Sequence, residues 1–244
     1  MAAGGRYTLE IAANSLESAL AAQAGGADRV ELCENLGEGG ATPSYGTLAA
    51  ARDRLQIPLY VLIRPRGGDF VYSPAEWDVM QRDVELCVGL GCDGVVLGAL
   101  DAHGAVDTAG CAQLIAAAGG LGVTFHRAID CAADPLVALE AVIGLGCERV
   151  LTSGQADSAP EGAAVIASLV TRSAGRIAVM AGAGVTAQTL PMLARQSGVD
   201  EFHASAKAWW TGAGGTTPSG LEAGFWRTDA QLVRSLRDGL DGLG

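Results

Sequence analysis

Gly26-Ala27-Asp28-Arg29-Val30 is the first of four copies of one short pattern: a glycine, any residue, an acid, any residue, then Val or Phe. The other copies begin at Gly91, Gly146 and Gly198, so the pattern returns every 52 to 65 residues. Each copy lies between a helix-like run and a strand-like run, where a glycine can end the helix in the left-handed conformation. One copy per βαβα pair makes eight strands from four copies. The 244 residues therefore suit an α/β protein with a single (β/α)₈ barrel, the TIM barrel.

The expected elements follow this repeat along the chain. Helix starts are expected at Asn14, with Glu17 as its capping-box partner, at Ser73-Pro74, and at Asp134-Pro135. The expected strands cover 7–12, 29–33, 58–64, 94–98, 122–127, 149–153, 176–181 and 201–204. An open doubly wound sheet is disfavoured, because the repeat is evenly spaced and no GxGxxG follows the first strand.

The C-terminal part of the chain departs from the repeat. The segment 209–228 is rich in glycine, Thr and Ser and holds two adjacent tryptophans, so we expect a long loop after the eighth strand. A terminal helix is expected over 229–242, which leaves 1–244 as one barrel domain without a linker.

Composition limits the classes of partner. No apolar stretch approaches twenty residues, and the first residues lack the regions of a signal peptide, so we expect a cytoplasmic protein with no membrane partner. Six cysteines without a CxxC pair do not indicate a disulfide framework. A net charge of −11 opposes binding to nucleic acid, but it leaves room for a small anion at a local basic site.

Ionisable residues recur where the expected strands end. Five residues after the repeat glycine stand Glu31, Val96, Leu151 and His203. Because alternate strands fill one interior layer, Glu31 and His203 should point inward at equal height, with Cys33 and Ser205 nearer the mouth. Odd strands add Glu10, Arg64 and His126. We take Glu10, Glu31, His126 and His203 as candidate catalytic residues and Arg64 as an anion clamp, although any one of them could be a satisfied interior residue.

The loops after the last strands suggest an anion-binding site. Gly182 and Gly184 follow the seventh strand and Ser205 follows the eighth, the usual place for phosphate in this fold. Ser153, after the sixth strand, adds a hydroxyl donor, and Asn35 lies in the glycine-rich loop after the second. We expect these residues to contact a small polar or anionic molecule.

A metal site is the alternative use of the same mouth. His126, His203 and Cys33 could ligate copper, with Glu31 as a carboxylate ligand. Cu(I) prefers thiolate and thioether ligands, and no Cys or Met pair in this chain has close spacing. The residues alone therefore leave copper binding open.

Several long motifs together resemble the CutC copper homeostasis family, and the resemblance runs from the first strand to Lys207. They are 29–36, 39–44, 63–70, 93–98, 124–130, 151–154 and 201–206. The resemblance implies a cytoplasmic (β/α)₈ barrel linked to copper homeostasis and copper ion binding.

Two functions follow as hypotheses. The first, implied by the resemblance, is a copper-handling protein. The second, favoured by the residues, is a TIM-barrel enzyme that uses acid/base chemistry on a small polar, phosphorylated or sugar-like substrate. A scaffold that works as a homo-oligomer is a third alternative, which the sequence alone does not test.

Overall fold

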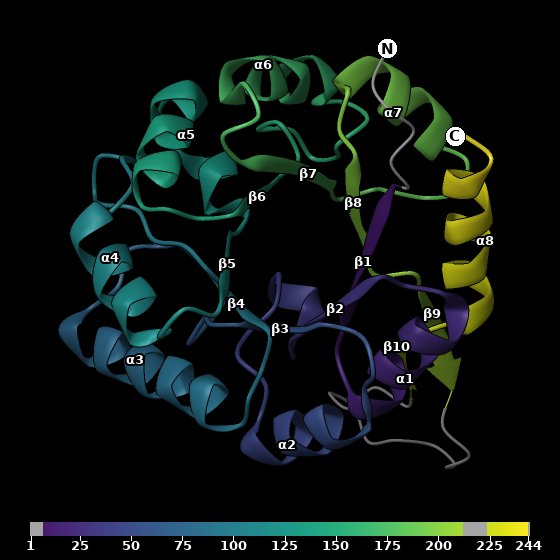
Figure 1. The fold of residues 1–244 in the computed structure, drawn as a ribbon, viewed down its shortest axis with the longest axis horizontal. Coiled ribbons are helices and arrows are strands. Elements are labelled where there is room, and N and C mark those ends of the chain that lie inside the picture. Colours follow the sequence, from purple (N-terminus) through teal and green to yellow (C-terminus); the bar gives the residue numbers. More distant parts are fainter. Residues whose placement is uncertain (1–6, 212–223, 244) are drawn as a thin grey trace.

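The computed structural model describes residues 7–211 and 224–243, and its eight parallel strands form a closed barrel in which β8 pairs with β1. Helices surround the strands on the outside (Figure 1). The barrel strands are β1 (Thr8–Ala13), β2 (Arg29–Leu32), β3 (Leu59–Leu62), β4 (Gly94–Leu97), β5 (Gly122–Phe125), β6 (Arg149–Thr152), β7 (Ala178–Gly182) and β8 (Glu201–Ala204). The prediction of a TIM barrel is confirmed.

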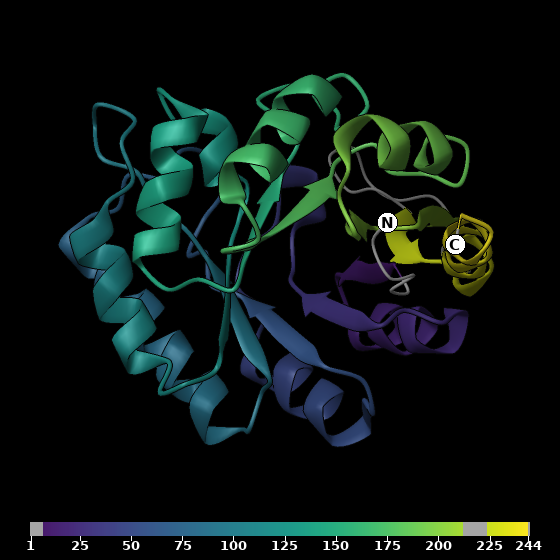
Figure 2. The ribbon, with the colours of Figure 1, turned by 45° about the horizontal axis from the view of Figure 1, so that its top comes forward.

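Eight α-helices and two short 3₁₀ turns accompany the strands within the described residues. They are α1 (Leu16–Gly25), α2 (Tyr45–Arg54), η1 (Leu36–Glu38), α3 (Pro74–Gly89), α4 (Thr108–Ala117), η2 (Arg127–Cys131), α5 (Pro135–Gly144), α6 (Ala163–Ser173), α7 (Leu190–Ser197) and α8 (Ala230–Asp241). Figure 2 shows the helices from a second direction, again outside the strands. No helix in the described part of the chain is both long and apolar enough to cross a membrane.

The residues of the repeated pattern have structural roles at the helix ends and between the strands. Its four glycines all have positive φ, from 68° to 93°, the conformation that ends each preceding helix. The acid that follows ties neighbouring strands together in two of the copies. The carboxylates of Asp28 and Asp93 each accept the backbone N–H of the previous strand, from Leu9 and Leu59, at 2.8 Å. The glycine thus ends the helix in all four copies, and in two of them the acid also links the next strand to the one before it.

The main apolar core lies between the strands and the helices. It includes the outward-facing Leu9, Ile11, Val30, Phe125 and Phe202, which have no exposed surface. A smaller apolar cluster lies inside the barrel, so polar and charged side chains occupy much of the remaining interior. Each strand is therefore apolar on the face that the helices cover, whereas its inward face carries polar side chains as well.

Two predicted details are wrong. The first helix is capped by Ser15, not Asn14: the Ser15 hydroxyl accepts the Ser18 N–H, and Asn14 instead donates its side-chain amide to the Trp226 carbonyl at 2.8 Å. The loop predicted over 209–228 holds two strands, β9 (Lys207–Thr211) and β10 (Gly224–Thr228), which pair antiparallel. Aromatic and threonine residues favour this pairing; residues 212–223 of the predicted loop lie outside the described residues.

Candidate functional site

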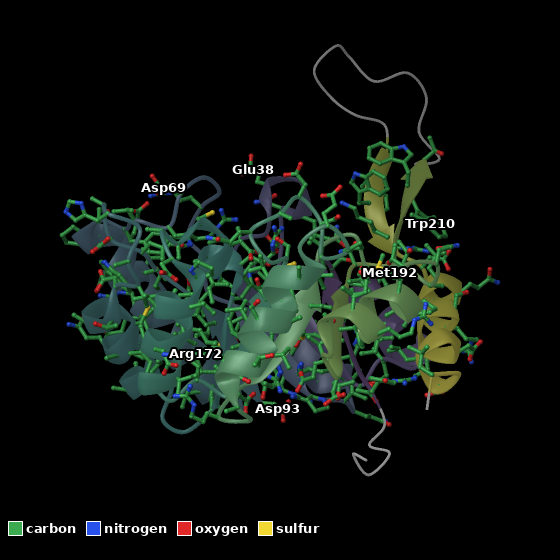
Figure 3. The ribbon with its side chains drawn as sticks, turned by 90° about the horizontal axis from the view of Figure 1, so that it is seen from above. Glu38, Asp69, Asp93, Arg172, Met192 and Trp210 are labelled. Atoms are coloured by element: carbon green, nitrogen blue, oxygen red, sulfur yellow. The ribbon has the colours of Figure 1, made fainter. Side chains whose placement is uncertain are left out.

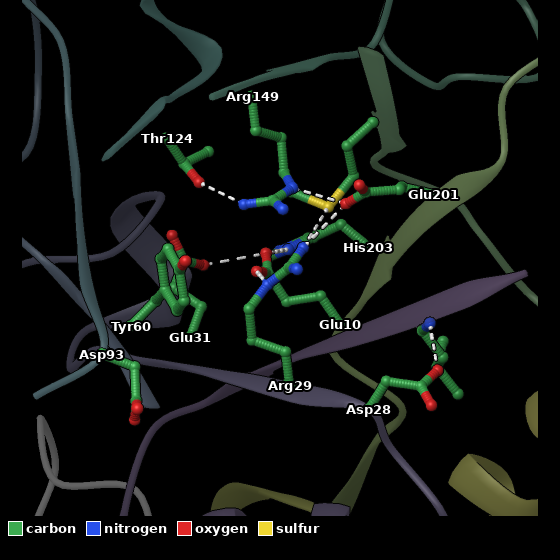
Figure 4. Close-up of polar contacts among 12 residues, drawn as sticks. Glu10, Asp28, Arg29, Glu31, Tyr60, Asp93, Thr124, Arg149, Glu201 and His203 are labelled. Atoms are coloured by element: carbon green, nitrogen blue, oxygen red, sulfur yellow. Dashed lines mark hydrogen bonds and ion pairs between the residues drawn. The ribbon is translucent and has the colours of Figure 1, made fainter. Parts of the chain in front are cut away.

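Glu10, Glu31 and His203 meet inside the barrel, where the repeat predicted that Glu31 and His203 would face inward (Figure 4). Strand register makes this possible. Glu10 of β1 is the partner of His203 on β8 and, on its other side, of Arg29 on β2. Glu31 stands two residues after Arg29, so it shares the inward face of β2. The Nδ1 atom of His203 lies 2.7 Å from Glu10 Oε1, and its Nε2 atom lies 3.5 Å from Glu31 Oε2. One imidazole therefore bridges two buried carboxyl groups.

The three groups have shifted pKa values. Burial raises the pKa of Glu31 to about 7, and the Glu10 charge adds to this, although His203 opposes it. Burial also disfavours the charge on Glu10, but Arg29 and His203 outweigh it and lower the pKa of Glu10 to about 2. For His203, burial is outweighed by Glu31 and Glu10, which raise its pKa. Glu10 is thus an anion, whereas Glu31 titrates near neutral pH and His203 holds its proton more strongly than a free imidazole does.

Arg29 holds Glu10 from below, as part of a charged cluster near the amino ends of the strands. The Arg29 guanidinium pairs with Glu10 and, at 2.9 Å, with Glu201. Arg149 pairs with Glu201 as well and donates to Thr124 at 3.2 Å. These charges neutralise one another within the barrel and do not line the cavity, so the cluster positions Glu10 rather than facing a ligand.

Our sequence reasoning missed this cluster, although the repeat contained the signal. Arg29, Gly94, Arg149 and Glu201 all stand three residues after a repeat glycine. Residues two apart share a strand face, so this position lies one layer below Glu31 and His203. Applying the same alignment one step toward the amino ends would have found both arginines.

His126 presents a neutral ring to the mouth. It follows β5, and its Nδ1 accepts the Ala128 N–H at 3.1 Å. Burial, helped by the charge of Arg64, lowers the pKa of His126 to about 3. The acceptor role of Nδ1 places the proton on Nε2. Among the described residues this buried Nε2 atom has no hydrogen-bond partner, so its N–H is an unsatisfied donor within a ring that faces the mouth.

Arg64 keeps a positive charge at the same mouth. Its guanidinium donates to the carbonyls of Glu38, Gly40 and Gly68 at 2.8–2.9 Å. Carbonyl groups solvate the cation without neutralising it. In the described part of the chain no carboxylate pairs with Arg64. The side chain can therefore attract an anion from a buried position.

A cavity of about 620 Å³ opens at this end of the barrel. Its acidic, basic and histidine lining residues are Glu31, Arg64, His126, Arg127, His203 and Lys207. Arg127 is paired with Asp130 at 2.8 Å, whereas Lys207 has no ion pair with a described carboxylate. The walls between them are largely apolar and include Leu36, Leu62, Phe70, Leu151, Val185 and Leu236. Few convergent polar groups in a mostly apolar hollow are typical of a small-molecule site.

The predicted site residues divide into three groups. Glu31, Cys33, Arg64, His126, His203, Gly184 and Ser205 line the cavity. Glu10 lies beneath His203 with no exposed surface. Asn35, Ser153 and Gly182 are not in the cavity wall: Asn35 precedes η1, Ser153 is buried against Asp130, and Gly182 packs beside Leu151. The ligand contacts predicted for these three remain untested predictions, whereas Lys207 and Arg127 reach the wall without having been selected.

The predicted copper ligands His126, His203 and Cys33 do not form a ligand group in the described residues. The group whose ligand atoms all lie within 4.8 Å of one another is Glu10, Glu31 and His203. Glu10 is already bound by Arg29, and burial raises the pKa of the Cys33 thiol, which disfavours thiolate. Two carboxylates and one imidazole do not fit Cu(I), which prefers sulfur ligands.

Comparison with known proteins identifies the family. The CutC family model matches residues 7–208, so the chain belongs to the CutC family. A family protein CutC from Xanthomonas axonopodis pv. citri (strain 306) is 58% identical over 238 residues, which cover 95% of this chain and 98% of that protein. One from Bacteroides thetaiotaomicron is 52% identical over 83% of this chain and 82% of its own length.

Solved structures agree on the fold. The crystal structure of a CutC protein from Streptococcus agalactiae, whose name refers to copper homeostasis, shares 35% identity at a TM-score of 0.78 and covers 82% of this chain and 98% of its own. Thiamine phosphate pyrophosphorylase from Pyrococcus furiosus matches with a TM-score of 0.61 at 15% identity, over 97% of this chain and 96% of its own. At that identity, the second likeness shows the barrel alone.

Proposed function

We propose that this CutC family chain is a barrel enzyme that moves a proton on a small polar anion. The observation that carries the proposal is the close approach of Glu31 to His203 at the floor of an open cavity, where the pKa values of both groups are raised, that of Glu31 to about 7. Groups with such values are a recurring property of catalytic sites. A barrel built only for stability would fill these places with apolar side chains.

Each polar group has a distinct part in the proposed reaction. The Glu31 carboxylate takes a proton from the substrate, and His203 returns one, while Glu10 holds the His203 ring through Nδ1. The His126 Nε2–H donates a hydrogen bond to a substrate oxygen on which negative charge develops. Arg64 and Lys207 bind the anionic group and hold the substrate above Glu31. Proton abstraction beside a carbonyl is the reaction class that uses all of these groups.

The copper role implied by the name of the Streptococcus relative is the second candidate. The observation in its favour is the close approach of Glu10, Glu31 and His203. The oxygen-rich donor set and the engagement of Glu10 with Arg29 both count against Cu(I), so we rank it below the enzyme. The six free cysteines support the cytoplasmic location that we include in the proposal.

Deuterium exchange in a metabolite mixture tests the enzyme proposal without a known substrate. A bacterial small-molecule extract is incubated in D₂O with the protein and analysed by untargeted mass spectrometry. We expect at least one anionic compound to gain deuterium or change mass with the wild type and not with Glu31→Gln. Glu85→Gln, the same substitution on the exposed surface of α3, is the matched control and should act like the wild type. No difference between the wild type and Glu31→Gln would contradict the proposal.

A further inference from the structure

The hairpin of β9 and β10 stands at the rim of the cavity. Figure 3 shows it rising on the side of the barrel that carries Glu38 and Asp69, away from Asp93 before β4. Its base is anchored to the barrel by two hydrogen bonds: Asn14 donates to the Trp226 carbonyl at 2.8 Å, and the Thr228 N–H donates to Ser18 Oγ at 3.1 Å. The hairpin therefore has a fixed position beside the mouth.

The two faces of the hairpin carry different residues. In the antiparallel register Trp226 lies opposite Trp209, and Phe225 lies opposite Trp210. Opposite residues share a face and neighbours alternate, so Lys207, Trp209 and Trp226 occupy one face. The contacts agree, because Lys207 Nζ lies 4.8 Å from the centre of the Trp226 ring and the Trp209 and Trp226 rings lie 5.2 Å apart. Trp210 is on the other face, under the Arg227 guanidinium.

The face of Lys207, Trp209 and Trp226 adjoins the cavity through Lys207. Lys207 lines the cavity and contacts the Trp226 ring, so the two indoles lie next to one residue of the cavity wall. Trp209 is 44% exposed and Trp226 is 40% exposed, which leaves a large aromatic surface open beside a ligand site. Exposed apolar surface that adjoins a cavity marks a binding region more often than a lone exposed side chain does. Because the family model ends at residue 208, both indoles lie outside the matched residues.

We propose that this face is a second subsite, which binds a planar ring carried by the same anionic ligand. Lys207, the one lysine in the sequence, binds the anionic group, and its ammonium is held over the Trp226 ring by a cation–π contact. The ring of the ligand stacks on the indoles beyond it. The cavity of about 620 Å³ has room for a ligand larger than a simple anion. The inference rests on the proposed function only in that the ligand is an anion at this mouth.

Two phosphate monoesters separate the contribution of the ring from that of the charge. Binding of methyl phosphate and phenyl phosphate is measured by calorimetry. We expect the wild type to bind phenyl phosphate about tenfold more tightly, the scale of one aromatic stacking contact. Trp209→Ala should remove most of this preference and leave the affinity for methyl phosphate within about twofold, since Lys207 keeps its own contact with Trp226. Lys207→Gln should weaken binding of both compounds by about tenfold.

Trp210→Ala is the matched control, because Trp210 is 40% exposed like Trp226 but lies on the opposite face. It should keep the preference for phenyl phosphate, and so should Trp209→Phe, which retains an aromatic ring. Reductive methylation with ¹³C-formaldehyde gives a single dimethyl-lysine NMR signal, because the sequence holds one lysine. That signal should shift when either phosphate monoester is added.

Three results would overturn the subsite. The first is equal affinity of the wild type for the two compounds. The second is an equal loss of the preference for phenyl phosphate in Trp209→Ala and Trp210→Ala. The third is a dimethyl-lysine signal that does not shift when either compound is added. If methyl phosphate binds and the phenyl ring adds nothing, the subsite fails and the proposed function stands. If neither compound binds the wild type, the subsite fails together with the anion site of the proposed function, whereas the deuterium exchange still tests proton transfer independently.

Discussion

At the scale of single residues, Glu31 is costly to the fold in its charged form. Its pKa of about 7 in the folded protein exceeds the ordinary value of 4.5, because burial disfavours the carboxylate. Between these two values the folded state binds more protons than the unfolded chain, so stability falls as pH rises through the window. The raised pKa of His203 acts in the same direction. Glu31 thus lowers stability at neutral pH while lining a cavity, which indicates a role in function rather than in folding.

Glu31→Gln should therefore flatten the pH dependence of stability. We expect the wild type to lose more unfolding free energy than Glu31→Gln does between pH 5 and pH 8, by about 1–3 kcal/mol. Urea unfolding at both pH values measures this difference. An equal loss in the two proteins would show that Glu31 ionises in the folded state as it does in water.

The ligand chemistry of single residues also decides the copper question. Cys33 is buried, and His126 and His203 are engaged by Ala128 and Glu10. Replacing Cys33, His126 and His203 together should therefore leave the Cu(I) affinity unchanged within about threefold, as measured by competition with a chelator. A much larger loss of affinity would restore copper as the ligand of this mouth.

At the scale of elements, the starts of β2, β6 and β8 are joined by buried charge. Arg29 links Glu10 of β1 to Glu201 of β8, and Arg149 joins the same Glu201 from β6. Within a closed barrel, such a network ties strands that are far apart in the sequence. Removing Arg29 takes away the partner that Glu10 and Glu201 share and leaves each carboxylate with one partner, His203 or Arg149, so the loss costs more than losing a surface pair.

Arg29→Met should lower the unfolding free energy by about 3–5 kcal/mol. Arg82→Met is the matched control, because Arg82 pairs with Asp78 on the exposed surface of α3, and it should change stability by less than about 1 kcal/mol. Thermal and urea unfolding give both values. Similar effects of the two substitutions would mean that the interior cluster contributes no more than a surface ion pair.

The strands could be predicted from the sequence more fully than the segments between them. Period-two alternation and the repeat glycine fix which side chains of β2 and β8 face inward, so Glu31 and His203 were found. The position of the Tyr60 ring inside the barrel could not be predicted, because it depends on two glycines on neighbouring strands. A β-carbon on Gly94 would lie 2.1 Å from a Tyr60 atom, and one on Gly122 would lie 2.2 Å from another. The hairpin was missed because glycine-rich composition outweighed the strand preference of its Trp and Thr residues.

At the scale of the whole molecule, barrel closure is what brings the candidate residues together. Glu10 and His203 are 193 positions apart in the sequence, yet they are partners across the β1–β8 pair that closes the sheet. The sequence predicted this meeting from the repeat alignment, the alternation of strand faces and the expectation of a closed barrel. It could not predict that the loops would leave Arg64 and His126 with unused donors, because those depend on side-chain packing around each group.

The whole chain carries a net charge of −11, yet the cavity presents Arg64 and Lys207 without carboxylate partners among the described residues. A local positive site on an acidic protein favours a small anion over a polyanion, because the surrounding field repels large negative surfaces while the cavity focuses the attraction. This separation of local and overall charge agrees with the small-molecule ligand that we propose.

Histidine NMR across pH tests the central claim most directly, since the sequence has only three histidines and the claim depends on two of them. We predict that His126 stays neutral, with its proton on Nε2, down to about pH 4, in line with a pKa of about 3. His203 should keep its proton above pH 6.5 and lose part of that upward shift in Glu31→Gln. Titration of both rings together near pH 6.5, unaffected by Glu31→Gln, would contradict the account of this mouth as an acid/base site.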